Sequence, residues 1–365
     1  MYIKIYDRNH NLIDSIEQIY DPKTIHTLNG VNKFTCSLPL GISKVNVDTV
    51  NLMNHVEFYD DNHNLKFGGI LVNIDYNMPT VAISCYGWAF ILQKIRLKEK
   101  EYAETTYSEL VQTIFEQYIS GEYYNAQRYS DFAYIGQSST DGHIATVTER
   151  KVDNKDNLWD KLVDWATDIN AYVYITDDRG FYFEKTIKQN QMWYAKWEDS
   201  DINKLGLSTT FNNLLSIPSV SLSVIDMSND VYGEVSIEKD GTTTILYKNS
   251  KDLTSINQYG LLQSYFDVND SASVQSTVNS KVNAELSRCS YPLSSMDIAI
   301  SDSILAPLDE IKVGHSITVY IEPYLEYETT TKILEIERDY TTNTAKLKVG
   351  ETLFKDNAPK VINYK

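Results

Sequence analysis

The residues in this sequence that could do chemistry are carboxylates and histidines. His55, Asp60, Asp61 and His63 lie close together, and these residue types bind metals when the fold brings them to one point. Asp60, Asp61 and His63, however, fall where a hairpin tip is expected, and Asp and Asn are typical of tight turns because they tolerate left-handed backbone. We therefore interpret this cluster as a turn and expect no metal site.

Paired carboxylates are the second chemical candidate. Glu322 with Glu326 and Asp199 with Asp201 have the residue type that glycoside hydrolysis uses, but that reaction needs two carboxyl groups facing each other across a sugar. A solvated acidic loop is the simpler interpretation. The sequence contains no glycine-rich phosphate loop, paired-histidine zinc signature or nucleophile elbow. We expect no enzyme, and we assign no catalytic, cofactor-binding or metal-ligating residue.

The charge balance argues against stable nucleic-acid binding. The chain has 33 basic and 50 acidic residues, a net charge of −17, and no cluster of Lys and Arg that would form a basic face. An acidic surface instead lets a polyanion pass without adhering. The three cysteines, Cys36, Cys85 and Cys289, are widely spaced, so buried thiols are expected rather than disulfides or a metal site. No apolar run reaches membrane-spanning length.

Tyrosine is the unusual residue, with 27 Tyr against 11 Phe and 5 Trp. A tyrosine ring with its polar tip suits surfaces that become half-buried in contacts, although biased codon usage explains the same count. The segment Tyr118 to Tyr134 places Tyr123, Tyr124 and Tyr129 among polar residues. Two readings stay open: an irregular loop folded onto its own domain, or a surface that stacks on sugars or seats a protein partner.

The elements that would position these residues are mainly strands. Residues 1–95 predict a small β-barrel or sandwich in which the turns 7–11 and 60–64 form two similar hairpin tips. Residues 96–200 change period. Thr106 to Glu109 matches a capping box before a helix, and Asn157 with Asp160 opens a second helix that leads into a β-hairpin. The result is a mixed α+β domain.

The second half of the chain returns to strands around one long polar helix. That helix is predicted from Ser271 to about Arg288 and carries a narrow apolar stripe of Val274, Val278, Val282 and Leu286. The stripe either packs on its own domain along one line or contacts a partner subunit, so these residues, with the three loop tyrosines, are our candidate interface. Strands are predicted at residues 298–300, 317–321, 333–336 and 345–350.

These patterns together resemble a family, the tail-tip or baseplate hub proteins of long-tailed, siphovirus-like bacteriophages. The carrying residues are Ser255-Ile256-x-x-Tyr259-Gly260 before an Asp-rich turn and a polar helix, strands around Gly314, and a closing Val349-Gly350. The front of the chain is similar as well, in Phe34 to Leu40 and in Phe67-Gly68-Gly69-Ile70-Leu71. The same architecture begins the tail-associated lysins.

The resemblance implies a mainly β protein with α+β insertions, built from two tube-like β-barrel domains and smaller mixed α/β domains. The expected domains are residues 1–95, the first barrel; 96–200, the mixed domain; 201–235 with 300–354, the second barrel; 236–299, an insertion with the long helix; and 355–365, a tail too short for a catalytic domain.

The implied function is that of a virion structural protein, found in the phage tail tip or baseplate and assembled in the host cytoplasm. A homotrimer would close the distal end of the tail tube, connect it to the baseplate ring and open for DNA passage. Its partners would be the distal tail ring, tail tube and tape-measure proteins, with no cofactor. The alternatives are a host-receptor or carbohydrate-binding tail module and, third, a cell-wall hydrolase.

Overall fold

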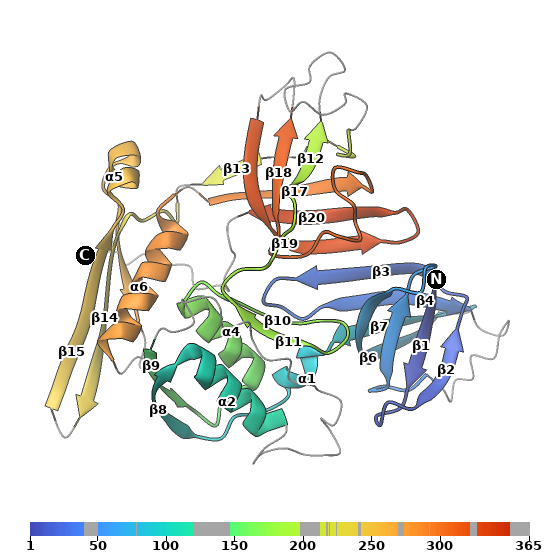
Figure 1. Ribbon diagram of the computed structural model, residues 1–365, viewed down its shortest axis with the longest axis horizontal. Helices are drawn as coiled ribbons and strands as arrows, with labels where there is room; N and C mark the ends of the chain where they lie inside the picture. Colours follow the sequence, from blue (N-terminus) through green and yellow to red (C-terminus); the bar gives the residue numbers. More distant parts are fainter. Residues whose placement is uncertain are drawn as a thin grey trace.

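The computed structural model describes residues 1–39, 50–77, 79–119, 147–197, 212–216, 218, 220–223, 225–239, 242–268, 274–291, 293–321 and 327–350. Within these ranges the protein is mainly β, and one 13-stranded sheet dominates it (Figure 1). Four hydrophobic cores underlie the elements. In the part of the chain that the structure describes, no helix is long and apolar enough to cross a membrane.

The N-terminal β module consists of seven antiparallel strands around one core. They are β1 (Tyr2–Tyr6), β2 (Leu12–Ile16), β3 (Tyr20–Thr27), β4 (Lys33–Pro39), β5 (His55–Tyr59), β6 (Leu65–Asn77) and β7 (Thr80–Gly87), in the spatial order β3-β4-β7-β6-β5-β1-β2. In β7 every second residue is buried, as expected for a strand with one face on a core. Phe34, Phe58 and Phe67 stack at its centre.

The C-terminal β module consists of β12 (Trp193–Trp197), β13 (Val220–Ser223), β17 (Leu293–Ser301), β18 (Ser316–Ile321), β19 (Tyr327–Asp339) and β20 (Thr344–Gly350). Its strands surround a second core that includes Ile317, Leu347 and Val349. The pairing of β12 with β18 is parallel, whereas β17, β18, β19 and β20 pair antiparallel.

A closed barrel in either module stays a prediction. In the C-terminal module the segment 212–216 links β12 to β17, because the Asn213 N–H donates to the Lys196 carbonyl (3.1 Å) and the Leu215 N–H donates to the Ala299 carbonyl (2.8 Å). In the N-terminal module β2 pairs with β1 alone among the described strands. In the C-terminal module, the short segment 212–216 thus connects the two end strands of the hydrogen-bonded series β12-β18-β19-β20-β17. In the N-terminal module, the series of hydrogen-bonded strands ends at β2.

The mixed unit has a core of its own, which includes the buried side chains of Trp88, Trp159 and Trp165. It consists of α1 (Ala89–Gln93), β8 (Lys100–Thr106), α2 (Tyr107–Ile119), β9 (Val147–Val152), α4 (Leu158–Asp168), β10 (Tyr172–Ile175) and β11 (Phe181–Glu184). The predicted capping box is confirmed, since the Glu109 N–H donates to Thr106 Oγ1 (3.2 Å) and the Thr106 N–H donates to the Glu109 carboxylate (3.3 Å). Asn157 caps α4 by accepting from the Asp160 N–H (2.8 Å).

The inserted unit is a three-stranded sheet with a helix on one face. Its elements are β14 (Asp230–Lys239), β15 (Thr242–Lys251), α5 (Leu253–Tyr259), β16 (Gln263–Asp267) and α6 (Gln275–Cys289), with the strand order β15-β14-β16. Helix α6 packs on β14 at Gly233, where an added Cβ would lie 2.4 Å from Val282 Cγ2. The glycine therefore sets how closely the helix approaches the sheet.

Two strands lie at other places than the predicted domain boundaries suggest. Trp193–Trp197, inside the predicted mixed domain 96–200, pairs with β18 and belongs to the core of the C-terminal module. Strand β14 crosses the predicted boundary at residue 235 and pairs only within the inserted unit among the described strands. The pairing of β12 with β18 joins segments far apart in the sequence, which local patterns do not encode, whereas β14 pairs with β15, the next strand along the chain. The domain boundaries themselves remain a prediction.

Candidate functional site

The most extensively built feature of this chain is the junction between the two β modules. Strand β3 of the N-terminal module pairs antiparallel with β19 of the C-terminal module, from Lys23 opposite Asp339 to Thr27 opposite Glu335. Backbone bonds continue the contact at both ends, from the Leu28 N–H to the Leu334 carbonyl (2.9 Å) and from the Tyr340 N–H to the Pro22 carbonyl. One sheet therefore passes from one module into the other (Figure 1).

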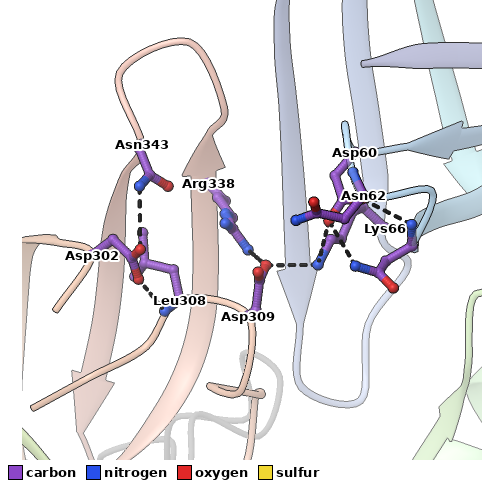
Figure 2. A network of polar contacts seen from close by, with 9 residues as sticks. Asp60, Asn62, Lys66, Asp302, Leu308, Asp309, Arg338 and Asn343 are labelled. Carbon is purple, nitrogen blue, oxygen red and sulfur yellow. Dashed lines mark hydrogen bonds and ion pairs between the residues drawn. The ribbon is translucent and has the colours of Figure 1, made fainter. Parts of the chain in front are cut away.

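Ion pairs reinforce this backbone contact. The Lys23 ammonium lies 3.1 Å from the Asp339 carboxylate in the strand pair itself. Figure 2 shows a second network, in which the Asp309 carboxylate contacts both Lys66 Nζ of β6 (2.6 Å) and the Arg338 guanidinium of β19. Lys66 also reaches Asp60 (3.2 Å), and the Lys66 and Arg338 side chains are only 12 % and 11 % exposed. Two nearly buried cations from different modules thus share one carboxylate.

The electrostatics of Asp309 follow from these partners. Partial burial would raise the pKa of this carboxyl, but the Lys66 and Arg338 cations outweigh it and hold the pKa below its usual range. The same balance applies to Asp339, where burial is outweighed by the Thr342 N–H and Lys23. Both carboxylates therefore stay ionised at neutral pH, so the ion pairs persist.

An aromatic side chain adds an apolar contact to the junction. Tyr340, directly after β19, packs its ring edge-on against Phe58 of the N-terminal core at 4.9 Å. The Arg338 guanidinium lies over the Tyr340 ring, 4.5 Å from its centroid. Burial raises the pKa of Tyr340 to about 12, so its hydroxyl is neutral. A side chain of the C-terminal module thereby completes the core of the N-terminal module.

The hairpin β10–β11 of the mixed unit contacts both modules at this junction. The Gly68 N–H of β6 donates to Asp177 Oδ1 at 3.3 Å, and the Val173 N–H donates to Asn29 Oδ1 at 2.9 Å. Gly68 permits this approach, because an added Cβ would lie 2.0 Å from the Asp177 carbonyl oxygen. On the other side Lys332 of β19 lies over the Tyr172 ring. Three units meet here, so their relative orientation is fixed by several independent contacts.

The contacts at this site form a rigid connection between the modules. Its charged groups are paired with one another, and its tyrosine is neutral. Among the residues that the structure describes, no group of three or more His, Cys, Asp or Glu is arranged to hold a metal ion. What the arrangement does is to hold two β modules in one orientation.

The predicted interface residues divide into three sets. Val278 and Val282 are fully buried against the sheet of their own unit, whereas Val274 and Leu286 are half-buried at the ends of the same stripe. The middle of the stripe therefore packs on its own domain. Tyr123, Tyr124 and Tyr129 lie outside the described residues. An interface role for the predicted residues, in the stripe and among the tyrosines, remains a prediction.

The candidate chemical residues form turns and packing contacts. Asp60 accepts from the Asn62 and Asn64 N–H groups (2.9 and 2.8 Å), as Asp7 does from Asn9 and Asn11 (both 2.8 Å), so the two predicted hairpin tips are confirmed as near copies. His55 is buried edge-on against Trp88. All three cysteines are buried and free, as predicted. The pairs Glu322 with Glu326 and Asp199 with Asp201 lie outside the described residues.

Sequence reasoning missed the residues of the junction. Strand β3 contains Asp21 and Pro22, which are typical of turns, and Pro is rare inside strands. Arg338 and Asp309 are ordinary surface-type residues in the sequence, and Lys66 lies far from both along the chain. No local spacing signals that the three meet. A pattern of paired substitutions among relatives is the signal that would have found them.

Comparison with known proteins identifies the fold. No family model matches the sequence, and no curated protein sequence matches it. Among solved structures, a prophage tail protein from Listeria monocytogenes aligns with a TM-score of 0.65 at 12 % identity, covering 96 % of this chain and 95 % of that one. A tail protein from Neisseria meningitidis aligns with a TM-score of 0.63 at 9 % identity, covering 96 % of each chain.

A third structure gives the same result. The 43 kDa tail protein of prophage MuSo2 from Shewanella oneidensis aligns with a TM-score of 0.63 at 8 % identity, covering 96 % of this chain and 98 % of that one. Identities this low carry no residue roles across, but the alignments extend over nearly the whole of each chain. The resemblance stated from sequence motifs is therefore confirmed at the level of fold: this chain has the fold of phage tail proteins.

Proposed function

We propose that this chain is a structural protein of a phage tail tip, in which a homotrimer forms a hub at the distal end of the tail tube. The hub connects the tube to the baseplate ring and opens for DNA passage. Its partners are the distal tail ring, the tail tube and the tape-measure proteins of the same virion. The role is structural, with no catalytic step assigned to any residue.

The observation that carries this proposal is the continuous sheet across the junction. Because β3 pairs with β19, and Lys66 and Arg338 share Asp309, the two modules move as one body. Three such chains around a threefold axis present six β modules, which is the number needed to meet a sixfold tube. If the two modules were loosely linked, assembly would have to fix their relative orientation in each chain. A rigid junction fixes that orientation before assembly.

The charge of the chain supports the same role. With a net charge of −17, a ring of three chains repels a passing polyanion wherever its channel carries the acidic surplus. The proposed hub therefore lets DNA through without holding it. Each β module in a ring also gains a neighbour that covers exposed strand edges, such as β2, which otherwise favour aggregation.

The mass of the purified chain in solution tests the proposal. Native mass spectrometry and light scattering should give three times the 41.8 kDa of one chain, and electron microscopy should show a ring with six similar lobes. A species that stays monomeric over a hundredfold range of concentration, and also when mixed with the distal tail ring protein, would refute the trimeric hub. Release of soluble fragments from purified peptidoglycan would refute the purely structural role.

A further inference from the structure

His10 lies where the N-terminal module meets the mixed unit. It stands at the tip of the β1–β2 hairpin in left-handed backbone (φ 63°), and its ring stacks on Tyr6 with the centroids 4.4 Å apart. Arg179 stands at the tip of the β10–β11 hairpin, also in left-handed backbone (φ 73°). Arg179 Nη2 lies 3.4 Å from His10 Nε2, so the tips of the two hairpins are in direct contact.

The chemistry of arginine determines where the His10 ring carries its proton. A guanidinium donates hydrogen bonds and accepts none, so His10 Nε2 must be the acceptor and carries no hydrogen. In the neutral ring the proton is then on Nδ1, which lies 3.4 Å from Nδ1 of His55. His10 donates to His55 there. Hydrogen bonds therefore run in one direction, from Arg179 to His10 and from His10 to His55.

A second group lies beside the same ring nitrogen. Glu57 Oε1 is 3.7 Å from His10 Nε2, and the side chains of Glu57 and His10 are 11 % and 24 % exposed. The other oxygen, Glu57 Oε2, accepts from the hydroxyls of Tyr6 (2.8 Å) and Tyr59 (2.6 Å). Burial and the hydrogen bond to Glu57 raise the pKa of Tyr6 to about 12, so this hydroxyl keeps its proton. The carboxylate is thus held in place beside the histidine.

The remaining charged groups nearby have partners of their own. Lys4 of β1 is in register with Glu57, and its ammonium lies over the Tyr59 ring, 4.9 Å from the centroid. The Asp7 carboxylate accepts from two backbone N–H groups of its own turn. The Asp178 carboxylate accepts from a threonine hydroxyl in the turn of the other hairpin. The titratable or charged groups that contact the His10 ring directly are therefore Tyr6, His55, Glu57 and Arg179.

We propose that His10 is a proton-dependent contact between the two units: the neutral ring accepts from Arg179, and the protonated ring releases Arg179 and donates to Glu57. When Nε2 gains a proton from solvent, two donors face each other at the Arg179 contact and two positive charges come together. The same N–H then has an anionic acceptor beside it in Glu57. Acidification thus exchanges a hydrogen bond between the units for one within the N-terminal module. This inference does not depend on a trimeric hub.

The position of the ring proton tests the first part of the proposal. The full chain is labelled with ¹⁵N at histidine, and the His10 signals are identified by their absence in His10→Gln. Long-range proton–nitrogen correlation spectra at pH 8 should show the His10 proton on Nδ1. A proton on Nε2 at this pH would overturn the proposal, because the Arg179 guanidinium then has no acceptor on the ring.

Hydrogen exchange of the β10–β11 turn tests the second part. The amides of Thr176 and Gly180 bond within this turn, and their rates are compared with the intrinsic rate at each pH and with the amides of β7. They should exchange about threefold faster at pH 5.5 than at pH 8, because one hydrogen bond between the units is lost. His10→Gln keeps an acceptor that does not titrate, and Arg179→Met removes the donor, so both variants should lose this pH effect.

His63→Gln is the matched control, because the second hairpin tip is a near copy of the first. His63 has the same backbone conformation as His10 (φ 63°), but its Nδ1 lies 3.3 Å from the Tyr2 hydroxyl. The His63→Gln variant should therefore keep the threefold change. A pH effect that persists in His10→Gln and Arg179→Met, or one that disappears equally in His63→Gln, would overturn the proposal.

Discussion

Replacing Arg338 by Met tests whether the junction holds the two β modules together. The guanidinium contacts half-exposed Asp309 and lies over the Tyr340 ring, while the methionine keeps most of the apolar stem. Solvent screening limits the ion pair to about 1 kcal/mol, and the cation–π contact adds about 1 kcal/mol because the site is largely buried. Lys66 still pairs with Asp309, so no carboxylate is left alone. The expected loss at the junction is about 2 kcal/mol.

Hydrogen exchange measured by mass spectrometry reports this loss of stability strand by strand. Amides of β3 and β19 should exchange about 30-fold faster, since 1.4 kcal/mol corresponds to a factor of ten, while amides of β6 and β7 keep their wild-type rates. Lys346→Met is the matched control, because it removes a cation from the neighbouring strand β20. The Lys346 side chain is 74 % exposed, and its ammonium lies 3.7 Å from the Glu337 carboxylate. Similar exchange in both variants, or equally faster exchange throughout the N-terminal module, would refute the reasoning.

Three further changes test the packing of the other units. Gly233→Ala places a Cβ 2.4 Å from Val282 Cγ2 and should destabilise by about 2 kcal/mol in thermal unfolding, with partial rescue by Val282→Ala; no rescue would contradict the clash. Lys281→Met breaks a buried pair with Asp168 (3.3 Å) and should cost about 3 kcal/mol, but clearly less when Asp168→Asn is already present. Burial lowers the pKa of His315 below 6.5, so the unfolded chain takes up the proton first and stability falls as pH drops below 6.5. His315→Gln should flatten the decline of the melting temperature between pH 7 and 5.5, and an unchanged slope would exclude this histidine as its source.

The sequence by itself determined the elements whose signals lie within a few residues. The Thr106–Glu109 capping box begins α2, and Asn157 begins α4, because a cap joins atoms of one helical turn. The twin hairpin tips at Asp7 and Asp60 follow for the same reason, since each aspartate bonds the backbone two and four residues ahead. The loose family motifs also pointed to the fold that the structural comparisons bear out.

For α6 the sequence determined the helix but not its neighbour. A stripe four residues apart predicts that one face is apolar, and it fits a sheet of the same chain as well as a partner subunit. The tertiary structure buries Val278 and Val282 against β14 and β15 by means of Gly233, where only the absence of a side chain lets the helix come close. That choice depends on the shape of a surface made by other segments.

The tertiary structure alone decided the junction. Strand β3 carries a proline and turn-forming residues, so its local pattern argues against a strand, and pairing with β4 on one side and β19 on the other makes the extended conformation favourable. Lys66, Asp309 and Arg338 meet because that pairing brings their modules together. A strand pair and an ion pair between distant segments draw their free energy from contacts that exist only after the chain has folded, so no window of the sequence contains them.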